Sequence, residues 1–193
     1  MLVHDVQDRP STYDIDGVKM GYSTDFEGEF TIDPPLTEAQ TAYLKQFSDT
    51  RRMKRDPEKA AKLPDPIREA VGFSLGDDAE FFVAGAGFRG QDRDDSVVEY
   101  NNKPSTQPGL WCQWEPSDDG SKLRWNGAEK FYCYVEWLEY INENFLKIWG
   151  RKITGAVSWQ GERSSDFGLL TVGEVGVHVL PGVRASDTLE SRY

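Results

Sequence analysis

The chain has 193 residues, of which 38% are hydrophobic and 12% aromatic, so it is long enough for one domain with a substantial core. Its formal net charge of −11 argues against direct binding to nucleic acid or to an anionic membrane, because like charges repel. It has two cysteines, no apolar run of membrane-spanning length and no signal-peptide pattern at its start, so we expect a cytoplasmic protein.

Composition divides the chain into three parts. Residues 1–20 are polar without a sustained hydrophobic period and are predicted to be an N-terminal extension. Residues 21–180 contain the periodic segments and are predicted to form a single α+β domain. Residues 181–193 are polar again and are predicted to be a flexible C-terminal tail.

In the first half of the domain, residues 26–32 alternate apolar and acidic side chains, which predicts a half-buried strand. Two prolines follow, and Thr37 with Gln40 forms a capping box that predicts the start of a helix. Residues 80–84 (EFFVA) are predicted to be a second strand. The polar stretch 90–108 is predicted to be a long loop, a kind of segment that is often functional.

The second half is predicted to begin with a tryptophan-rich hairpin, which turns at residues 117–120 (SDDG). Apolar residues at spacings of three and four then predict a long amphipathic helix over residues 129–149. Gly150 stands where the C-cap of that helix is expected.

Alternating residues after the helix predict further strands over 153–159, 169–172 and 176–180. The whole order of elements predicts an α+β fold with an antiparallel or mixed sheet and two main helices packed on one face. This arrangement is close to a ferredoxin-like split βαβ with extra strands.

Four carboxylates on or beside the predicted strands are the candidates for catalysis. Glu27 and Glu29 share one face of the first strand, Glu162 closes a later strand, and Asp166 follows it. If these strands are neighbours, converging carboxylates can separate their pKa values and act as acid and base. The interpretation that we favour is that Glu27 and Glu29 line the solvent face of an antiparallel sheet.

A basic run stands out in this acidic chain. Arg51, Arg52 and Arg55 lie in the segment TRRMKR and are candidates for binding phosphate or an acidic surface through their guanidinium groups. The alternative is a solvated helix end, where positive charge complements the helix dipole.

Polar and aromatic side chains gather where the long loop meets the hairpin. Tyr100, Asn101 and Gln107 precede Trp111 and Trp114, and this combination is typical of surfaces that bind small ligands or peptides. Strand alternation places the two tryptophans on opposite faces, so one is expected in the core and the other is the candidate for an exposed interface. Core packing of both remains the alternative.

Metal and cofactor motifs do not appear. The two histidines, His4 and His178, lack metal-binding spacing, and no CxxC occurs, so neither a metal site nor a cofactor is predicted. Gly85, Gly87 and Gly90 have the form GxGxxG, but no periodic helix follows them. They predict a turn rather than a dinucleotide site.

Four stretches, GYSTDFEGEF, PPLTEAQTAYLKQFSDTRRMKR, QPGLWCQW and AEKFYCYVEWLEY, resemble a family of small uncharacterised bacterial and phage proteins. The resemblance spans roughly residues 21–179. It implies a prokaryotic or phage source and brings no activity or catalytic residue with it.

Together these features favour an acidic, non-enzymatic interaction protein that binds a protein partner, in the manner of an inhibitor, immunity or anti-defence protein. The partner is expected to present a basic surface, since opposite charge speeds association. The alternative is an enzyme or sensor for a phosphorylated small molecule, which would use the arginine cluster and the strand carboxylates. A structural subunit of a larger assembly is a third hypothesis.

Overall fold

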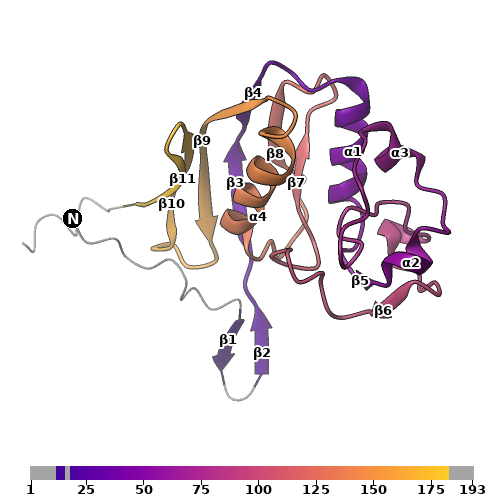
Figure 1. The fold of residues 1–193 in the computed structure, drawn as a ribbon. Helices are drawn as coiled ribbons and strands as arrows, with labels where there is room; N and C mark the ends of the chain where they lie inside the picture. The colour runs from indigo at the N-terminus through magenta and orange to yellow at the C-terminus, as the bar shows by residue number, and fades with distance from the viewer. Residues whose placement is uncertain (1–11, 16–17, 183–193) are drawn as a thin grey trace, which may run out of the picture.

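A computed structural model of the chain describes residues 12–15 and 18–182. An antiparallel sheet forms one half of the molecule, and a half with little regular structure lies beside α1 (Figure 1). The helices are α1 (Glu38–Ser48), α2 (Pro57–Ala60), α3 (Pro66–Ala70) and α4 (Tyr134–Ile141), with a 3₁₀ turn at Phe88–Gly90 and a π-helical turn at Asn142–Leu146. The strands are β1 (Thr12–Ile15), β2 (Val18–Gly21), β3 (Thr24–Gly28), β4 (Phe30–Asp33), β5 (Lys54–Arg55), β6 (Val97–Glu99), β7 (Trp114–Pro116), β8 (Lys122–Trp125), β9 (Lys152–Gly161), β10 (Phe167–Gly173) and β11 (Gly176–Pro181).

The main sheet runs in the order β11-β10-β9-β4-β8-β7, and β3 pairs with the other part of the long strand β9. Every pairing between the described strands is antiparallel. The predicted α+β class with a mostly antiparallel sheet is therefore confirmed. α1 lies in the connection from β4 to β7, and α4 lies in the connection from β8 to β9.

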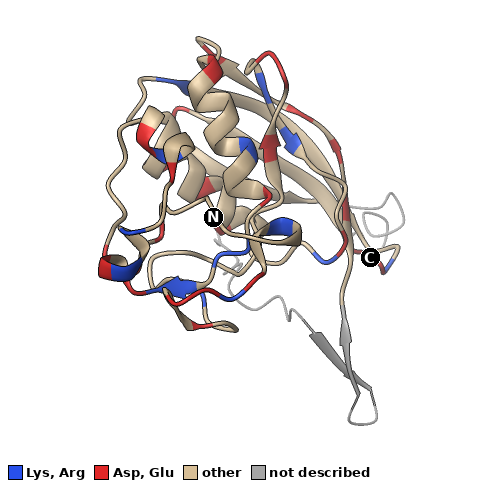
Figure 2. Ribbon diagram, turned by 90° about the vertical axis from the view of Figure 1, so that its right-hand side faces the viewer, with Lys and Arg blue, Asp and Glu red and all other residues tan. Residues whose placement is uncertain are grey.

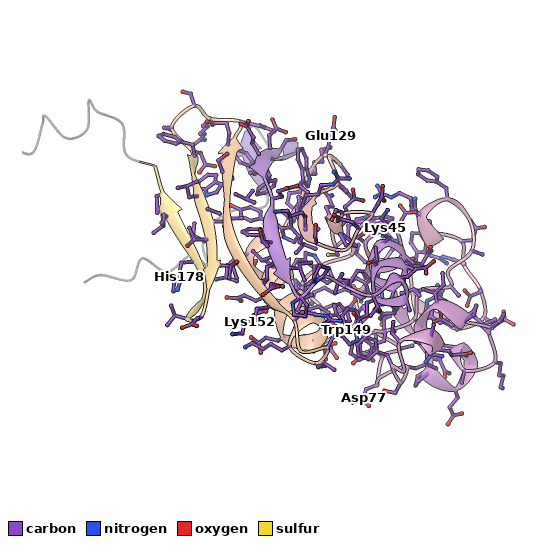
Figure 3. All side chains as sticks on the ribbon, turned by 90° about the horizontal axis from the view of Figure 1, so that it is seen from above. Lys45, Asp77, Glu129, Trp149, Lys152 and His178 are labelled. Carbon is purple, nitrogen blue, oxygen red and sulfur yellow. The ribbon has the colours of Figure 1, made fainter. Side chains whose placement is uncertain are left out.

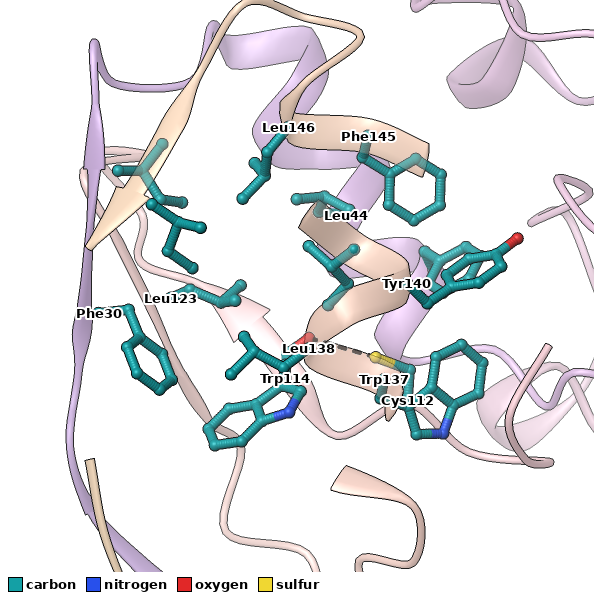
Figure 4. Packing of buried hydrophobic residues seen from close by; sticks show 14 of the residues in the cluster. Phe30, Leu44, Cys112, Trp114, Leu123, Trp137, Leu138, Tyr140, Phe145 and Leu146 are labelled. Carbon is teal, nitrogen blue, oxygen red and sulfur yellow. Dashed lines mark hydrogen bonds between the residues drawn. The ribbon is translucent and has the colours of Figure 1, made fainter. Parts of the chain in front are cut away.

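The core fills the space between the sheet and the two longer helices (Figure 4). The Phe47 ring of α1 packs edge-on against Trp137 of α4 at 6.0 Å and against Phe145 at 4.9 Å, measured between ring centroids. From the sheet side, Phe30 and Leu123 are fully buried, and their Cα atoms are partners across β4 and β8. Aromatic rings thus join the two helices to each other and to the strands.

Two local predictions are confirmed. The capping box is present, because the Gln40 N–H donates to the Thr37 hydroxyl and the Gln40 side chain accepts from the Thr37 N–H. The hairpin turn is also present. The Asp119 carboxylate accepts hydrogen bonds from the Ser117 hydroxyl and from the N–H and hydroxyl of Ser121, and these lower its pKa to about 2.

The predicted strand at residues 80–84 is wrong. The segment forms no strand, because side chains from elsewhere take its backbone groups. The Glu80 carbonyl accepts from Arg52 and Gln107, and the Val83 N–H donates to the buried Asp65 carboxylate at 3.1 Å. These bonds replace a strand ladder and fold the segment into the irregular half.

The long helix predicted over residues 129–149 is shorter than expected. Lys130 and Cys133 have φ values of 60° and 54°, a left-handed conformation that an α-helix does not continue through. α4 therefore begins at Tyr134, and its last part becomes π-helical at Asn142–Leu146.

The exposed face of α4 is acidic, and we expect its charge to reduce stability. Partial burial and the neighbouring Glu136 and Glu143 raise the pKa of Glu139 above its ordinary value. An acid with a raised folded-state pKa destabilises the fold when ionised, and protonation relieves this as pH falls through that pKa. Glu139→Gln should therefore raise the free energy of unfolding at pH 7 by less than about 1 kcal/mol. In urea titrations this gain should decrease as pH falls through the folded-state pKa and vanish below the ordinary carboxyl pKa of the unfolded chain. An unchanged gain at that low pH would contradict the cause given.

The hairpin of β1 and β2 falls largely within the predicted extension and lies apart from the main sheet (Figure 1). The rest of that extension, at 1–11 and 16–17, lies outside the described residues, as do His4 and residues 183–193 of the predicted tail. No helix among the residues that the structure describes has the length and apolar character needed to cross a bilayer.

Candidate interaction surface

The basic run after α1 divides between the interior and the surface. Arg52 and Arg55 are 2% and 3% exposed, whereas the Arg51 side chain is only partly covered. Of the three arginines predicted to bind phosphate, one therefore has a surface position.

Arg52 holds the irregular half of the molecule together. Its guanidinium donates to the Gln107 side chain at 3.3 Å and to the Glu80 carbonyl at 2.5 Å, and it lies 4.1 Å from the centre of the Phe47 ring. Burial lowers its pKa from the ordinary arginine value. Gln107 is itself 2% exposed and also donates to the Tyr140 hydroxyl, so this predicted binding residue lies in the interior.

Arg55 has a comparable role at the other end of the run. Its guanidinium donates to Asp94 at 2.7 Å and to Ser96 at 2.6 Å, and it lies 4.6 Å from the centre of the Phe82 ring. Partial burial pushes the pKa of Asp94 upward, but the hydrogen bonds from Arg55 and Ser96 outweigh this and hold it below its ordinary value. The ion pair ties β5 to the loop before β6.

Arg51 instead belongs to a row of alternating arginines and aromatic rings. The guanidinium carbon of Arg51 lies 4.5 Å from the centre of the Tyr100 ring and 5.6 Å from that of Trp111. Arg93 lies 4.9 Å from the same Tyr100 ring, and Arg89 lies 5.3 Å from the same Trp111 ring. The order Arg93–Tyr100–Arg51–Trp111–Arg89 is called the arginine–aromatic row below.

Hydrogen bonds hold the row in place. The Arg51 guanidinium donates to the Tyr100 carbonyl at 3.3 Å and to the Asn101 side chain at 3.2 Å, while the Arg51 N–H donates to the Arg89 carbonyl at 2.9 Å. Arg89 in turn donates to Asp49, just after α1, at 3.0 Å. Each cation–π contact adds about 0.5–1 kcal/mol at exposed sites. The hydrogen bonds and the cation–π contacts together position Arg51 and Arg89 against the rings.

One end of the row presents an exposed aromatic side chain. Phe88, which precedes Arg89, is 80% exposed. It lies in a tight turn in which Gly87, Arg89 and Gly90 have φ values of 77°, 52° and 59°. The predicted glycine turn is therefore present, and it carries Phe88 at the surface next to the arginines.

An open groove of about 570 Å³ adjoins the same end. Arg89 lines it together with Ala42 and Gln46 of α1, Ile67 of α3 and Asn126. Lys45 also lines the groove. Seen from above, it lies on the side of the molecule away from His178 of β11, so the groove is remote from the outer strand of the sheet (Figure 3). The groove and the row thus form one continuous surface through Arg89.

Trp111 and Trp114 have different surroundings. Trp114 is 1% exposed, packs on Phe26 and Phe131, and donates its indole N–H to the Tyr134 carbonyl at 2.8 Å. Trp111 is partly exposed and belongs to the row. Trp114 is therefore a core residue, whereas Trp111, Tyr100, Asn101 and Arg51 come together at the surface.

The strand carboxylates do not join this surface. Glu27 is exposed on β3, where its Cα partner on β9 is Ser158, and Glu29 lies 3.7 Å from Lys122. Glu162 accepts from the Ser23 N–H at 2.8 Å, and Asp166 accepts from the Tyr22 hydroxyl at 2.6 Å. Within the described part of the chain, each of these carboxylates is placed with strand or turn partners and not with the arginines.

Neither cysteine has an activated thiol. Burial raises the pKa of Cys112 to about 12, and partial burial with the nearby Glu136 raises that of Cys133. Nucleophilic cysteines need the opposite shift. Over residues 12–15 and 18–182 no group of three or more His, Cys, Asp or Glu side chains is arranged to hold a metal ion.

Charged residues of both signs surround the surface (Figure 2). The acidic Asp92 and Asp95 are exposed on the same stretch of chain as Arg89 and Arg93. Glu99 is exposed on β6, and Asp49, which pairs with Arg89, is exposed at the end of α1. The surface is therefore mixed in charge, in contrast to the strongly negative chain as a whole.

Sequence reasoning missed Arg89, Arg93 and Phe88. Phe88 and Arg89 lie within the predicted glycine turn, and Arg93 lies in the long predicted loop after it. The available signal was only this position in a loop region, which is often functional. No protein-family model matches the chain, and neither the curated proteins nor the solved structures include one that matches it. Its function must therefore be inferred from the geometry of its own residues.

Proposed function

We propose that this chain is a non-enzymatic interaction protein that binds a protein partner through the arginine–aromatic row. The observation that supports this most directly is the cation–π contact of three arginines with two rings, at 4.5–5.6 Å, beside the exposed Phe88. Tryptophan, tyrosine and arginine are the residues most enriched in the energetic centres of protein interfaces. A preorganised row also loses less side-chain entropy on binding.

A protein fits this surface better than a nucleic acid. Tyr100 and Trp111 each have two guanidinium groups over the ring, which limits the access of bases that would stack on the ring faces. The net charge of −11 also repels a polyanion over long distances. A basic partner would be attracted at long range, while close contacts would be made by the row.

We further propose an inhibitor, immunity or anti-defence role in a bacterial or phage setting, inside the cell. The support is the resemblance in sequence and the acidic composition. We also propose the ferredoxin-like split βαβ as the central part of the fold, with β3, β10 and β11 added. Its support is the order β9-β4-β8-β7, in which β8 separates β4 from β7 and β4 separates β8 from β9.

The alternative of an enzyme or sensor for a phosphorylated molecule gains no support from the contacts. Arg52 and Arg55 are engaged in the interior, and the candidate carboxylates Glu162 and Asp166 accept hydrogen bonds from Ser23 and Tyr22.

Site-specific photo-crosslinking tests the proposed function. A photoreactive phenylalanine at position 88 should crosslink a discrete protein in lysate of the source cells. The same probe at position 175 is the matched control, because Val175 is 87% exposed on the β10–β11 turn. Trp111→Ala should abolish the crosslink at position 88. Identical products at both positions, or none at position 88, would contradict the proposal.

A further inference from the structure

Some guanidinium N–H donors of the arginine–aromatic row have no acceptor among the described residues, and they indicate which chemical groups the partner must present. Arg93 is exposed, and no hydrogen bond or ion pair engages its guanidinium among the residues that the structure describes. Arg51 uses its Nε and one terminal nitrogen within the chain, and Arg89 uses its Nε. Because each guanidinium has five N–H donors, the row still has donors that require acceptors.

The shape of the guanidinium group decides which acceptors fit best. Each guanidinium presents its N–H donors in a planar fork, and a planar carboxylate is the group that matches this fork. In an extended segment, alternate side chains lie about 7 Å apart on one face. Two arginines that contact the same ring are close enough together for two such side chains to bind one arginine each. A segment with spaced carboxylates can therefore contact neighbouring arginines.

Phe88 adds a second requirement. A ring that is 80% exposed in a turn built from left-handed residues gains free energy when an apolar side chain covers it. Phe88 lies next to Arg89 in the chain, so one ligand can contact both. The occupant must then carry an apolar side chain close to its carboxylates.

We infer that the row takes an acidic linear segment of the partner protein, in which Asp or Glu side chains bind Arg51, Arg89 and Arg93 while an apolar residue packs on Phe88. This inference rests on the proposed function and names the partner's contact chemistry. The acidic segment is a short part of a partner whose surface is otherwise basic, so the net charge of −11 still attracts the partner as a whole. Beyond Arg89 the groove along α1 adjoins the row, and its lining residues Ala42 and Ile67 offer apolar contact to the same segment.

Peptide display on the full chain tests the inference. Random peptides of a dozen residues, selected on the wild-type protein, should be enriched in Asp and Glu within two or three positions of an apolar residue. A synthetic peptide with the enriched sequence should bind at least tenfold more weakly to Phe88→Ala and to Arg93→Ala, since loss of one interface anchor commonly exceeds 1.4 kcal/mol. Val175→Ala is the matched control and should leave the affinity unchanged.

The outcomes separate the two proposals. If selected peptides need Arg51 and Trp111 but show no acidic bias, the inference is wrong and the interaction surface stands. If they bind equally well to Phe88→Ala, Arg51→Ala and Trp111→Ala, both proposals fail. Preferential binding of a single-stranded oligonucleotide, or no enrichment at all, overturns the inference as well.

Discussion

Arg52→Ala is expected to lower the free energy of unfolding by about 3–5 kcal/mol. The substitution removes a large side chain that packs on Phe47, and it leaves the Gln107 side-chain oxygen without the donor it has at 3.3 Å. Both effects fall in the interior, where a cavity and an unsatisfied acceptor each reduce stability. Urea unfolding followed by tryptophan fluorescence measures the change.

Two further variants separate packing from charge. Arg52→Met keeps most of the volume and removes the buried charge, so we expect a smaller loss of about 1–3 kcal/mol, which comes from the unpaired acceptor. Arg51→Ala at the surface should lower stability by less than about 2 kcal/mol, because it removes two cation–π contacts and partly exposed hydrogen bonds. Equal losses for Arg51→Ala and Arg52→Ala would show that the interior role assigned to Arg52 is wrong.

Trp114→Ala is expected to cost about 3–5 kcal/mol of stability, whereas Trp111→Ala should cost less than about 2 kcal/mol. Trp114 is 1% exposed and packs on Phe26, Phe30 and Phe131, with ring centroids 5.3–5.6 Å apart. Trp111 makes two cation–π contacts at the surface. Thermal unfolding of the two variants should therefore give clearly different midpoints.

Binding should show the reverse order. A peptide selected on the wild-type chain should lose at least tenfold in affinity for Trp111→Ala. A folded Trp114 variant with a milder change, Trp114→Phe, should bind it almost as well as the wild type. If Trp114→Phe loses binding and Trp111→Ala keeps it, the two tryptophans have been assigned the wrong roles.

The parts of the fold that follow from local chemistry could be predicted from the sequence. Thr37 and Gln40 define the start of α1 because both capping bonds lie within four residues. Asp119 closes the hairpin turn for the same reason. The local pattern of residues 80–84 predicts a strand. In the structure, their backbone groups instead form hydrogen bonds with the side chains of Arg52 and Asp65, which are distant in the sequence. A local sequence pattern cannot indicate such bonds.

The candidate site could be predicted only in pieces. Arg51, Tyr100 and Trp111 stood out separately as a basic run and as aromatic residues beside a loop. Their contact depends on how residues 49–113 fold around the buried Arg52 and Arg55. The sequence does not distinguish these two buried arginines from Arg51, which lies at the surface. No sequence pattern marked Arg89 and Arg93, because a contact between an arginine and an aromatic ring requires no fixed spacing between the two residues in the sequence.

The most direct measurement is the affinity of the selected peptide for a variant in which Arg51, Arg89 and Arg93 are all replaced by alanine. A control variant with Arg124, Lys147 and Lys152 replaced by alanine changes the net charge equally at exposed positions outside the row. The first variant should remain folded and lose at least a hundredfold in affinity, and the control should bind like the wild type. Similar affinities for the two variants would contradict the claim that the arginine–aromatic row is the binding surface.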